Sequence, residues 1–186
     1  LHLSGLKVAE GLESVSALRE LRHLQLSLME GPEDLEYLSG LSCLERLNIH
    51  FPRGLKSLRG LEGVGAASGA PGKPDLVVDL WNCPDLQALD AMATGVQNLH
   101  LRLRGCPEVR NLDGLREHPS LEKLLLVLEG CDALEDLSAL NHIPNLRKLH
   151  LNVAGIPRGE TLLQSLAPQD DVHLVVVRKT QGYEHF

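Results

Sequence analysis

Three of the four cysteines in this chain of 186 residues recur at regular intervals, at Cys83, Cys106 and Cys131. Each follows the start of an apolar segment by seven residues, so a repeating fold would stack the three thiols. Stacked thiolates could bind a metal such as zinc, but no fourth ligand is evident. We therefore expect a ladder of buried thiols, acting as small apolar side chains and weak donors, and neither a metal nor another cofactor. Cys43 is expected to pack beside its apolar neighbour.

Histidines are the second group that could carry chemistry. Five of the nine fall between the apolar residues of alternating segments, at His2, His50, His100, His150 and His173. His150 and His173 occupy equivalent positions in neighbouring repeats, so we expect them to be adjacent. Such a pair could share a metal ion or respond to pH. The alternative is that they are ordinary polar residues on a sheet surface. Because no nucleophile and carboxylate accompany them in a catalytic arrangement, we expect a protein that is not an enzyme.

Two further pairs contain charged residues, and the second of them also contains an aromatic ring. Asp79 and Arg102 are expected to be cross-strand neighbours, worth about 0.2–1 kcal/mol if they pair. Trp81 is the only Trp of the chain, and the next repeat places Arg104 beside it. Trp and Arg are enriched at the energetic centres of protein interfaces. The alternative for Trp81 is that it covers the edge of a repeat beneath an insertion.

A short pattern, apolar-x-apolar-x-apolar, repeats along the whole chain and predicts the strands that hold these residues. Its first residues are Leu1, Leu24, Leu47, Leu76, Leu99, Leu124, Leu149 and Val172, with spacings of 23, 23, 29, 23, 25, 25 and 23. Alternation at period two predicts a strand with one buried face. Between the strands Leu recurs every third residue, as from Leu134 to Leu140, which predicts 3₁₀ or turn-like returns. A strand and a narrow return, repeated every 20 to 30 residues or so, predict a parallel solenoid.

The chain resembles the leucine-rich repeat family over essentially its full length. The resemblance rests on runs such as Leu121-x-x-Leu124-x-Leu126 and on the runs Gly105-Cys106-Pro107 and Gly130-Cys131-Asp132, which are similar to Cys-containing repeats of intracellular receptors. Another run, from Leu146 through Leu151, looks like the short repeats of phosphatase-regulatory proteins. The resemblance implies an α/β leucine-rich repeat solenoid of seven to eight repeats, forming a single domain over 1–186. It implies a parallel sheet on the concave face and short 3₁₀, turn or helical returns on the convex face.

Composition limits the classes of partner and the location that we expect. The net charge of −7 argues against nucleic acid or an anionic membrane as the general partner, although a local basic patch stays possible in principle. No apolar stretch reaches the roughly 18 residues that a membrane helix needs. Four Cys and no Asn-x-Ser/Thr acceptor favour an intracellular, cytoplasmic location.

The segment 63–74 is rich in Gly, Ala and Pro and lacks the apolar period, so we expect a mobile insertion there. The chain starts within a repeat and without Met, and we expect it to be part of a longer protein. Because solenoid ends expose their core, one end should be covered by more chain or by another subunit.

We therefore expect a non-catalytic scaffold that binds another protein, or a protein complex, on the concave face. The alternatives are the recognition domain of a larger ubiquitin ligase or intracellular receptor, and a structural subunit of a large assembly. The oligomeric state is left open. The expected contact residues are Asn48, His50, Asp79, Trp81, His100, Arg102, Arg104, His150, Asn152 and His173.

Overall fold

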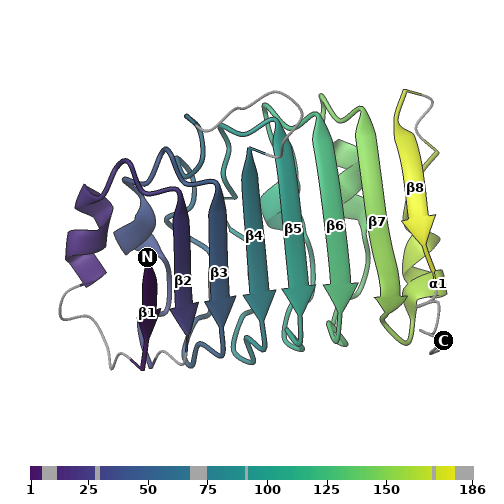
Figure 1. The fold of residues 1–186 in the computed structure, drawn as a ribbon. Coiled ribbons are helices and arrows are strands. Elements are labelled where there is room, and N and C mark those ends of the chain that lie inside the picture. Colours follow the sequence, from purple (N-terminus) through teal and green to yellow (C-terminus); the bar gives the residue numbers. More distant parts are fainter. Residues whose placement is uncertain (6–11, 28–29, 68–74, 91, 169–170, 179–186) are drawn as a thin grey trace, which may run out of the picture.

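The computed structural model describes residues 1–5, 12–27, 30–67, 75–90, 92–168 and 171–178. Eight strands form one sheet, in which each strand pairs in parallel with the next along the chain (Figure 1). They are β1 (His2–Ser4), β2 (His23–Ser27), β3 (Arg46–His50), β4 (Leu76–Trp81), β5 (Asn98–Arg104), β6 (Lys123–Glu129), β7 (Lys148–Gly155) and β8 (His173–Val177). The parallel, solenoid-like sheet predicted from the apolar alternation is confirmed.

The returns between the strands are short, as the three-residue spacing predicted. Four are 3₁₀ helices: η1 (Leu12–Ala17), η2 (Glu36–Leu38), η3 (Asp113–Leu115) and η4 (Ser138–His142). The last return contains the five-residue α-helix α1 (Gly159–Leu163). The helices that follow β2, β5, β6 and β7 lie behind the sheet in Figure 1 and leave its other face uncovered. Within the described residues, no helix is long and apolar enough to cross a lipid bilayer.

The core lies between the sheet and the returns, as columns of stacked aliphatic side chains. Leu101 of β5 is fully buried and lies between Val78 of β4 and Leu126 of β6, which are also fully buried. The returns of neighbouring repeats also contact each other closely. A Cβ atom added to Gly114 would lie 1.7 Å from the carbonyl oxygen of Leu89. Glycine is therefore required at that contact, and the repeats lock into one register.

At the insertion, the register differs from the sequence prediction by two residues. Leu47 pairs with Val78 and not with Leu76, and His50 pairs with Trp81. The apolar alternation Leu47-x-Ile49-x-Phe51 predicts Phe51 as a third inward residue of this strand, and that prediction was wrong. Phe51 adopts a left-handed backbone conformation with φ of 55°, which ends β3 at His50 and leaves the ring 40% exposed.

At the last strand, the register also differs from the prediction. Leu149 pairs with Leu174 and not with Val172, so the spacing of 25 residues continues. Because Val172, Leu174 and Val176 are all apolar, the sequence is compatible with either register. The predicted contact between His150 and His173 was therefore wrong.

The proposed insertion 63–74 is described only in part. Residues 63–67 form turns, and 68–74 lie outside the described residues. Its mobility stays a prediction.

Candidate functional site

The candidate site is the uncovered side of the sheet, which we call the open face and which corresponds to the face expected to be concave. It is formed by alternate residues of the strands, arranged in four rows. The first two rows, nearest the strand starts, are Asn98, Lys123, Lys148 and His173, then His23, Arg46, Val77, His100, Leu125, His150 and Val175. The other two are His2, Gln25, Asn48, Asp79, Arg102, Val127, Asn152 and Val177, then Ser4, Ser27, His50, Trp81, Arg104 and Glu129.

All ten residues expected at the contact surface lie on this face, and the register differences at β3 and β8 change which of them are neighbours. Asn48 lies beside Asp79, and Trp81 lies between His50 and Arg104. The last strand places His173 beside Lys148, one row away from His150. The structure thus brings together the central acidic, basic and aromatic residues and separates the two C-terminal histidines.

Asp79 is the centre of an ion-pair cluster near the strand ends, formed by Asp79, Arg102, Arg104 and Glu129 and called here the Asp79 cluster. Its Oδ2 atom lies 3.6 Å from a guanidinium nitrogen of Arg102 and 3.6 Å from one of Arg104. Arg104 also lies 3.8 Å from a carboxylate oxygen of Glu129. The predicted pairing of Asp79 with Arg102 is confirmed, and the two arginines are matched by two carboxylates on the same chain.

The burial of Asp79 distinguishes it from an ordinary surface acid. Its side chain is only 16% exposed, and its Oδ1 atom is buried without a hydrogen-bond partner in the part of the chain that the structure describes. Burying a carboxylate is costly unless neighbouring charges compensate it, and the two arginines provide that compensation. The Asp79 cluster therefore fixes the positions of Arg102 and Arg104 on the sheet.

An aromatic cluster adjoins the Asp79 cluster at the ends of β3 and β4. The Trp81 ring makes an edge-to-face contact with His50 at 5.5 Å between centroids and lies 5.7 Å from Phe51. Trp81 is 48% exposed, so much of its apolar surface faces solvent. An exposed Trp supported by neighbouring rings is available for contact at little cost in side-chain ordering.

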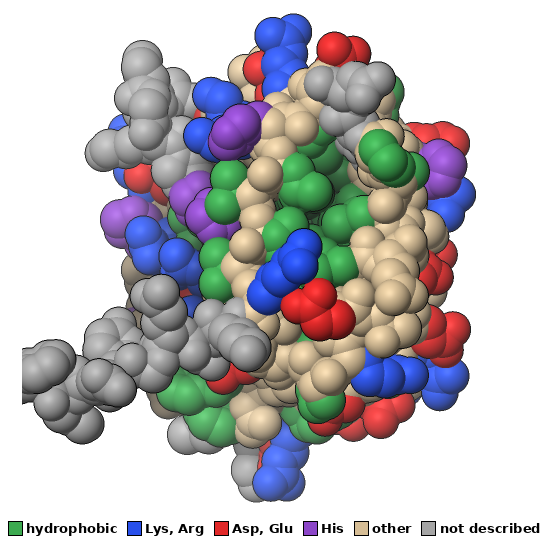
Figure 2. Space-filling model, turned by 90° about the vertical axis from the view of Figure 1, so that its right-hand side faces the viewer, with side chains coloured by type: hydrophobic (Ala, Val, Ile, Leu, Met, Phe, Trp, Pro, Cys, Tyr) green, Lys and Arg blue, Asp and Glu red, His purple; other side chains and the backbone are tan. Residues whose placement is uncertain are grey.

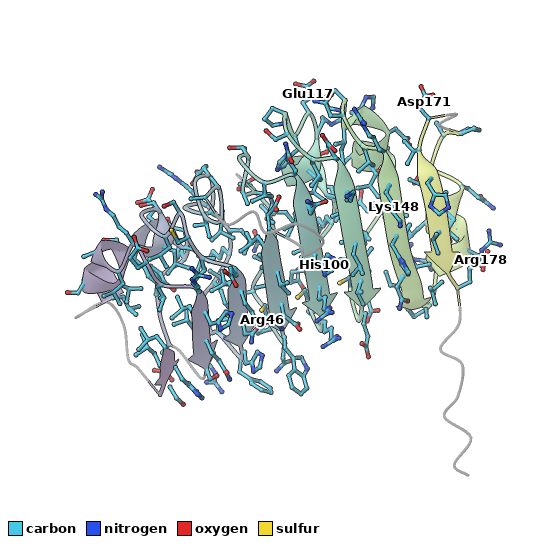
Figure 3. The ribbon with its side chains drawn as sticks, turned by 45° about the horizontal axis from the view of Figure 1, so that its top comes forward. Arg46, His100, Glu117, Lys148, Asp171 and Arg178 are labelled. Carbon is cyan, nitrogen blue, oxygen red and sulfur yellow. The ribbon has the colours of Figure 1, made fainter. Side chains whose placement is uncertain are left out.

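Toward the strand starts, the open face carries cations of a different kind. We call Arg46, His100, Lys123, Lys148 and His150 the basic strip; Figure 3 labels Arg46, His100 and Lys148, which come from β3, β5 and β7. Within the described part of the chain, none of the five is in an ion pair with a carboxylate. Burial lowers the pKa of His100 below its ordinary value, and the charges of Arg102, Arg46 and His150 lower it further. The neighbouring basic groups thus add to the effect of burial on the pKa of His100.

Apolar side chains lie beside the basic strip on the C-terminal strands. Leu125 and Val127 on β6, and Val175 and Val177 on β8, are half-buried although they point to the uncovered face. We call these four residues the apolar stripe. The open face therefore combines charged, aromatic and aliphatic contacts, which is the mixed make-up of a protein-binding surface.

The cysteine ladder lies beneath the ends of the strands and not on the open face. Cys83, Cys106 and Cys131 are fully buried, and the Cys131 thiol lies 3.7 Å from the carbonyl oxygen of Leu103. Hydrogen bonding to Cys106, followed by burial, raises the pKa of both Cys83 and Cys131, which favours neutral thiols. Among the described residues, no group of three or more His, Cys, Asp or Glu side chains could hold a metal ion. Hydrogen bonding to Cys131 and Cys83 lowers the pKa of Cys106, and all three thiols are packed in the core.

A second apolar surface lies at the C-terminal end of the sheet. Leu174 of β8 is 48% exposed, and Leu163, Leu166, Val172 and Val176 are half-buried around it. Figure 2 views the molecule from this end and shows a hollowed apolar area there, with histidines gathered at the left, toward the open face. Among the described residues, the columns of the core continue to this end, and an ion pair of 3.6 Å joins Arg178 after β8 to Glu160 in α1.

Sequence reasoning missed three cations of the open face, Arg46, Lys123 and Lys148. Each stands directly before the first inward Leu of its strand, so extending the alternation by one residue would have identified it. Phe51 was missed for another reason, because it was assigned to the core. No protein-family model and no curated protein matches this chain.

Proposed function

We propose that this protein is a leucine-rich repeat scaffold without catalytic activity that binds another protein through the open face. The observation that carries the proposal is Trp81, the single Trp, which is 48% exposed at the end of the middle strand β4 and flanked by His50 and Arg104. Large exposed aromatic rings next to arginines are the residues that most often dominate protein binding.

The chemistry around Trp81 supports binding over catalysis. The carboxylates nearest to it, Asp79 and Glu129, are both engaged by arginines. Ion pairs within the chain therefore occupy both carboxylates. The Asp79 cluster thus shapes a surface.

The rest of the open face supplies what an interface requires around such an anchor. The apolar stripe offers aliphatic contact on the C-terminal side of Trp81, and the basic strip offers charged contact toward the strand starts. Parallel strands linked by short returns give these groups fixed positions, so little conformational entropy would be lost on binding.

The test is affinity capture from the native source with a variant that changes two open-face contacts, Trp81→Ala with Val127→Arg. Loss of a 2 kcal/mol anchor weakens binding about 30-fold, so the partner should be lost from the captured fraction. A matched control changes two exposed residues outside the open face, Glu135→Ala with Arg158→Ala. If the control loses the same proteins, or the open-face variant keeps them all, the open face is not the interface.

The apolar C-terminal end supports a second candidate, a structural subunit whose end is covered by another polypeptide. Leu174 and its half-buried neighbours are the observation that favours it. Under this proposal, Leu174→Arg should remove an assembly partner while Trp81→Ala leaves it bound. Co-sedimentation of the two variants from the native source separates the candidates.

A further inference from the structure

Charge is distributed unevenly over this molecule. The chain has a net charge of −7, yet the ionised residues of the open face are mostly cations. They are Arg46, Arg102, Arg104, Lys123 and Lys148, against the two carboxylates of Asp79 and Glu129. The excess of acidic residues therefore lies elsewhere, and the sheet presents a positive surface on a negative protein.

Within the open face, the positive charge is uncompensated only in the basic strip. Arg102 and Arg104 have Asp79 and Glu129 as partners, so the Asp79 cluster is close to neutral. Lys123 and Lys148 lie side by side in the first row, and both are exposed. An exposed row of cations without counter-charges attracts an anionic ligand.

We propose that the basic strip binds an acidic segment of a partner protein, rich in Asp or Glu. This inference rests on the proposed function and specifies which kind of partner the open face accepts. Carboxylates of the segment would pair with Arg46, Lys123 and Lys148 in the way that Asp79 already pairs with Arg102 on the same sheet.

The dimensions of the strip set the length of the segment. It runs from Arg46 on β3 to Lys148 on β7, which are four strand spacings apart (Figure 3). Neighbouring strands lie about 4.8 Å apart, so the strip is about 19 Å long. An extended peptide advances about 3.3 Å per residue, so about six residues would cross it at right angles to the strands.

The surroundings of the strip favour a peptide over other anions. The apolar stripe begins in the second row, where Leu125 lies between His100 and His150. A peptide can place aliphatic side chains on Leu125 and carboxylates on the flanking cations, whereas a phosphodiester backbone offers only charge. The net charge of −7 also opposes the approach of a long polyanion or an anionic bilayer.

The test measures fluorescence anisotropy of a labelled peptide of six glutamates followed by two leucines, with the full 186-residue chain. A peptide with six glutamines in place of the glutamates is the matched ligand control. We expect the glutamate peptide to bind at low ionic strength and to weaken at least about tenfold near 0.5 M salt, where charges are strongly screened. The glutamine peptide should bind at least about tenfold more weakly.

Two triple variants with the same net charge locate the site. Arg46→Glu, Lys123→Glu and Lys148→Glu reverse the strip, and Arg19→Glu, Arg110→Glu and Arg158→Glu make the same change outside the open face. We expect the first triple to weaken the glutamate peptide at least about tenfold and the second by less than about threefold. Circular dichroism of both triples verifies that the fold is retained.

Three results would overturn the proposal: no binding of the glutamate peptide at low salt, equal weakening by both triples, or tighter binding of a thymidine oligonucleotide or of phosphatidylserine vesicles. These failures are separable from failure of the proposed function. If capture of a protein partner still depends on Trp81 and Val127 while the glutamate peptide does not bind, the open face is an interface for a partner that is not acidic.

Discussion

The Asp79 cluster and the basic strip occupy the same face of the same sheet, yet they differ in where their counter-charges lie. In the Asp79 cluster, each arginine has a carboxylate of this chain within 4 Å. In the basic strip, Lys123 and Lys148 stand next to each other with no such partner among the described residues. The arginines of the Asp79 cluster have carboxylate partners within the chain. The lysines of the basic strip have none among the described residues.

This difference separates structural charges from charges that are available for binding. A half-buried ion pair fixes side chains and contributes modestly to stability, because its desolvation cost offsets much of its attraction. An exposed unpaired lysine contributes little to folding but raises the association rate and specificity for an anionic partner. Variants in the two regions should therefore change different measured quantities.

The largest effect is expected beneath both regions, at Leu101, which lies between His100 and Arg102 in β5. Leu101→Ala leaves a cavity in a fully buried column and should lower the free energy of unfolding by about 2–5 kcal/mol. Urea denaturation measures that loss. Binding of the glutamate peptide by the fraction that stays folded should be nearly unchanged, and a selective loss of binding without loss of stability would contradict the division into core and surface.

An intermediate effect is expected when the Asp79 cluster is made to resemble the basic strip. Asp79→Ala removes the carboxylate between Arg102 and Arg104, which are 31% and 38% exposed and can partly recover hydration. We expect a loss of about 1 kcal/mol in stability, together with about threefold tighter binding of the glutamate peptide, because Arg102 loses its carboxylate partner and Arg104 keeps only Glu129.

The matched control for this change is Glu129→Ala, at a carboxylate that is 62% exposed. It should cost less than about 0.5 kcal/mol in urea denaturation. Equal losses of stability in the two variants would show that the buried Asp79 contributes no more than the exposed Glu129. Unchanged peptide affinity in Asp79→Ala would show that the ion pair with Asp79 does not keep the arginines from binding the peptide.

The smallest effect is expected from protonation of His100 in the basic strip. The groups facing it are Arg46, Arg102 and His150, and Val77 and Leu125 flank it on the adjacent strands. Because the folded-state pKa lies below the ordinary 6.5, the unfolded chain binds the proton more readily, and stability falls as pH drops below 6.5. Above that pH the group contributes no pH dependence.

His100→Gln should therefore reduce the loss of stability between pH 7.5 and pH 5.5, measured by urea denaturation at both values. His142→Gln, on an exposed return position, serves as the control. Identical pH dependence of wild type and His100→Gln would mean that neither burial nor the neighbouring basic groups lower the pKa of His100.

Much of the fold could be predicted from the sequence, because a two-residue and a three-residue period alternate along the chain. The parallel sheet, the short returns and the pairing of Asp79 with Arg102 all follow from that alternation. The register at β3 and β8 did not follow. Phe51 leaves its strand through a left-handed backbone conformation, and Val172 and Leu174 satisfy the apolar pattern equally well.

The candidate site was predicted less completely than the fold. Trp81 and Arg104 were placed side by side correctly, because both follow regular strand positions. Whether a cation has a counter-charge depends on side-chain contacts between repeats, which the apolar pattern does not encode. The contrast between Arg104, with two carboxylates nearby, and Lys148, with none among the described residues, required the structure.

The most direct measurement is site-specific photo-crosslinking in the native source, with benzoylphenylalanine placed at position 129 on the open face, in the row of Trp81, or at position 135 on an exposed return. Both positions are exposed, so the two probes have comparable access to solvent. We predict a crosslinked partner protein from position 129 and not from position 135. Crosslinking from position 135 alone would contradict the claim that the open face is the binding surface.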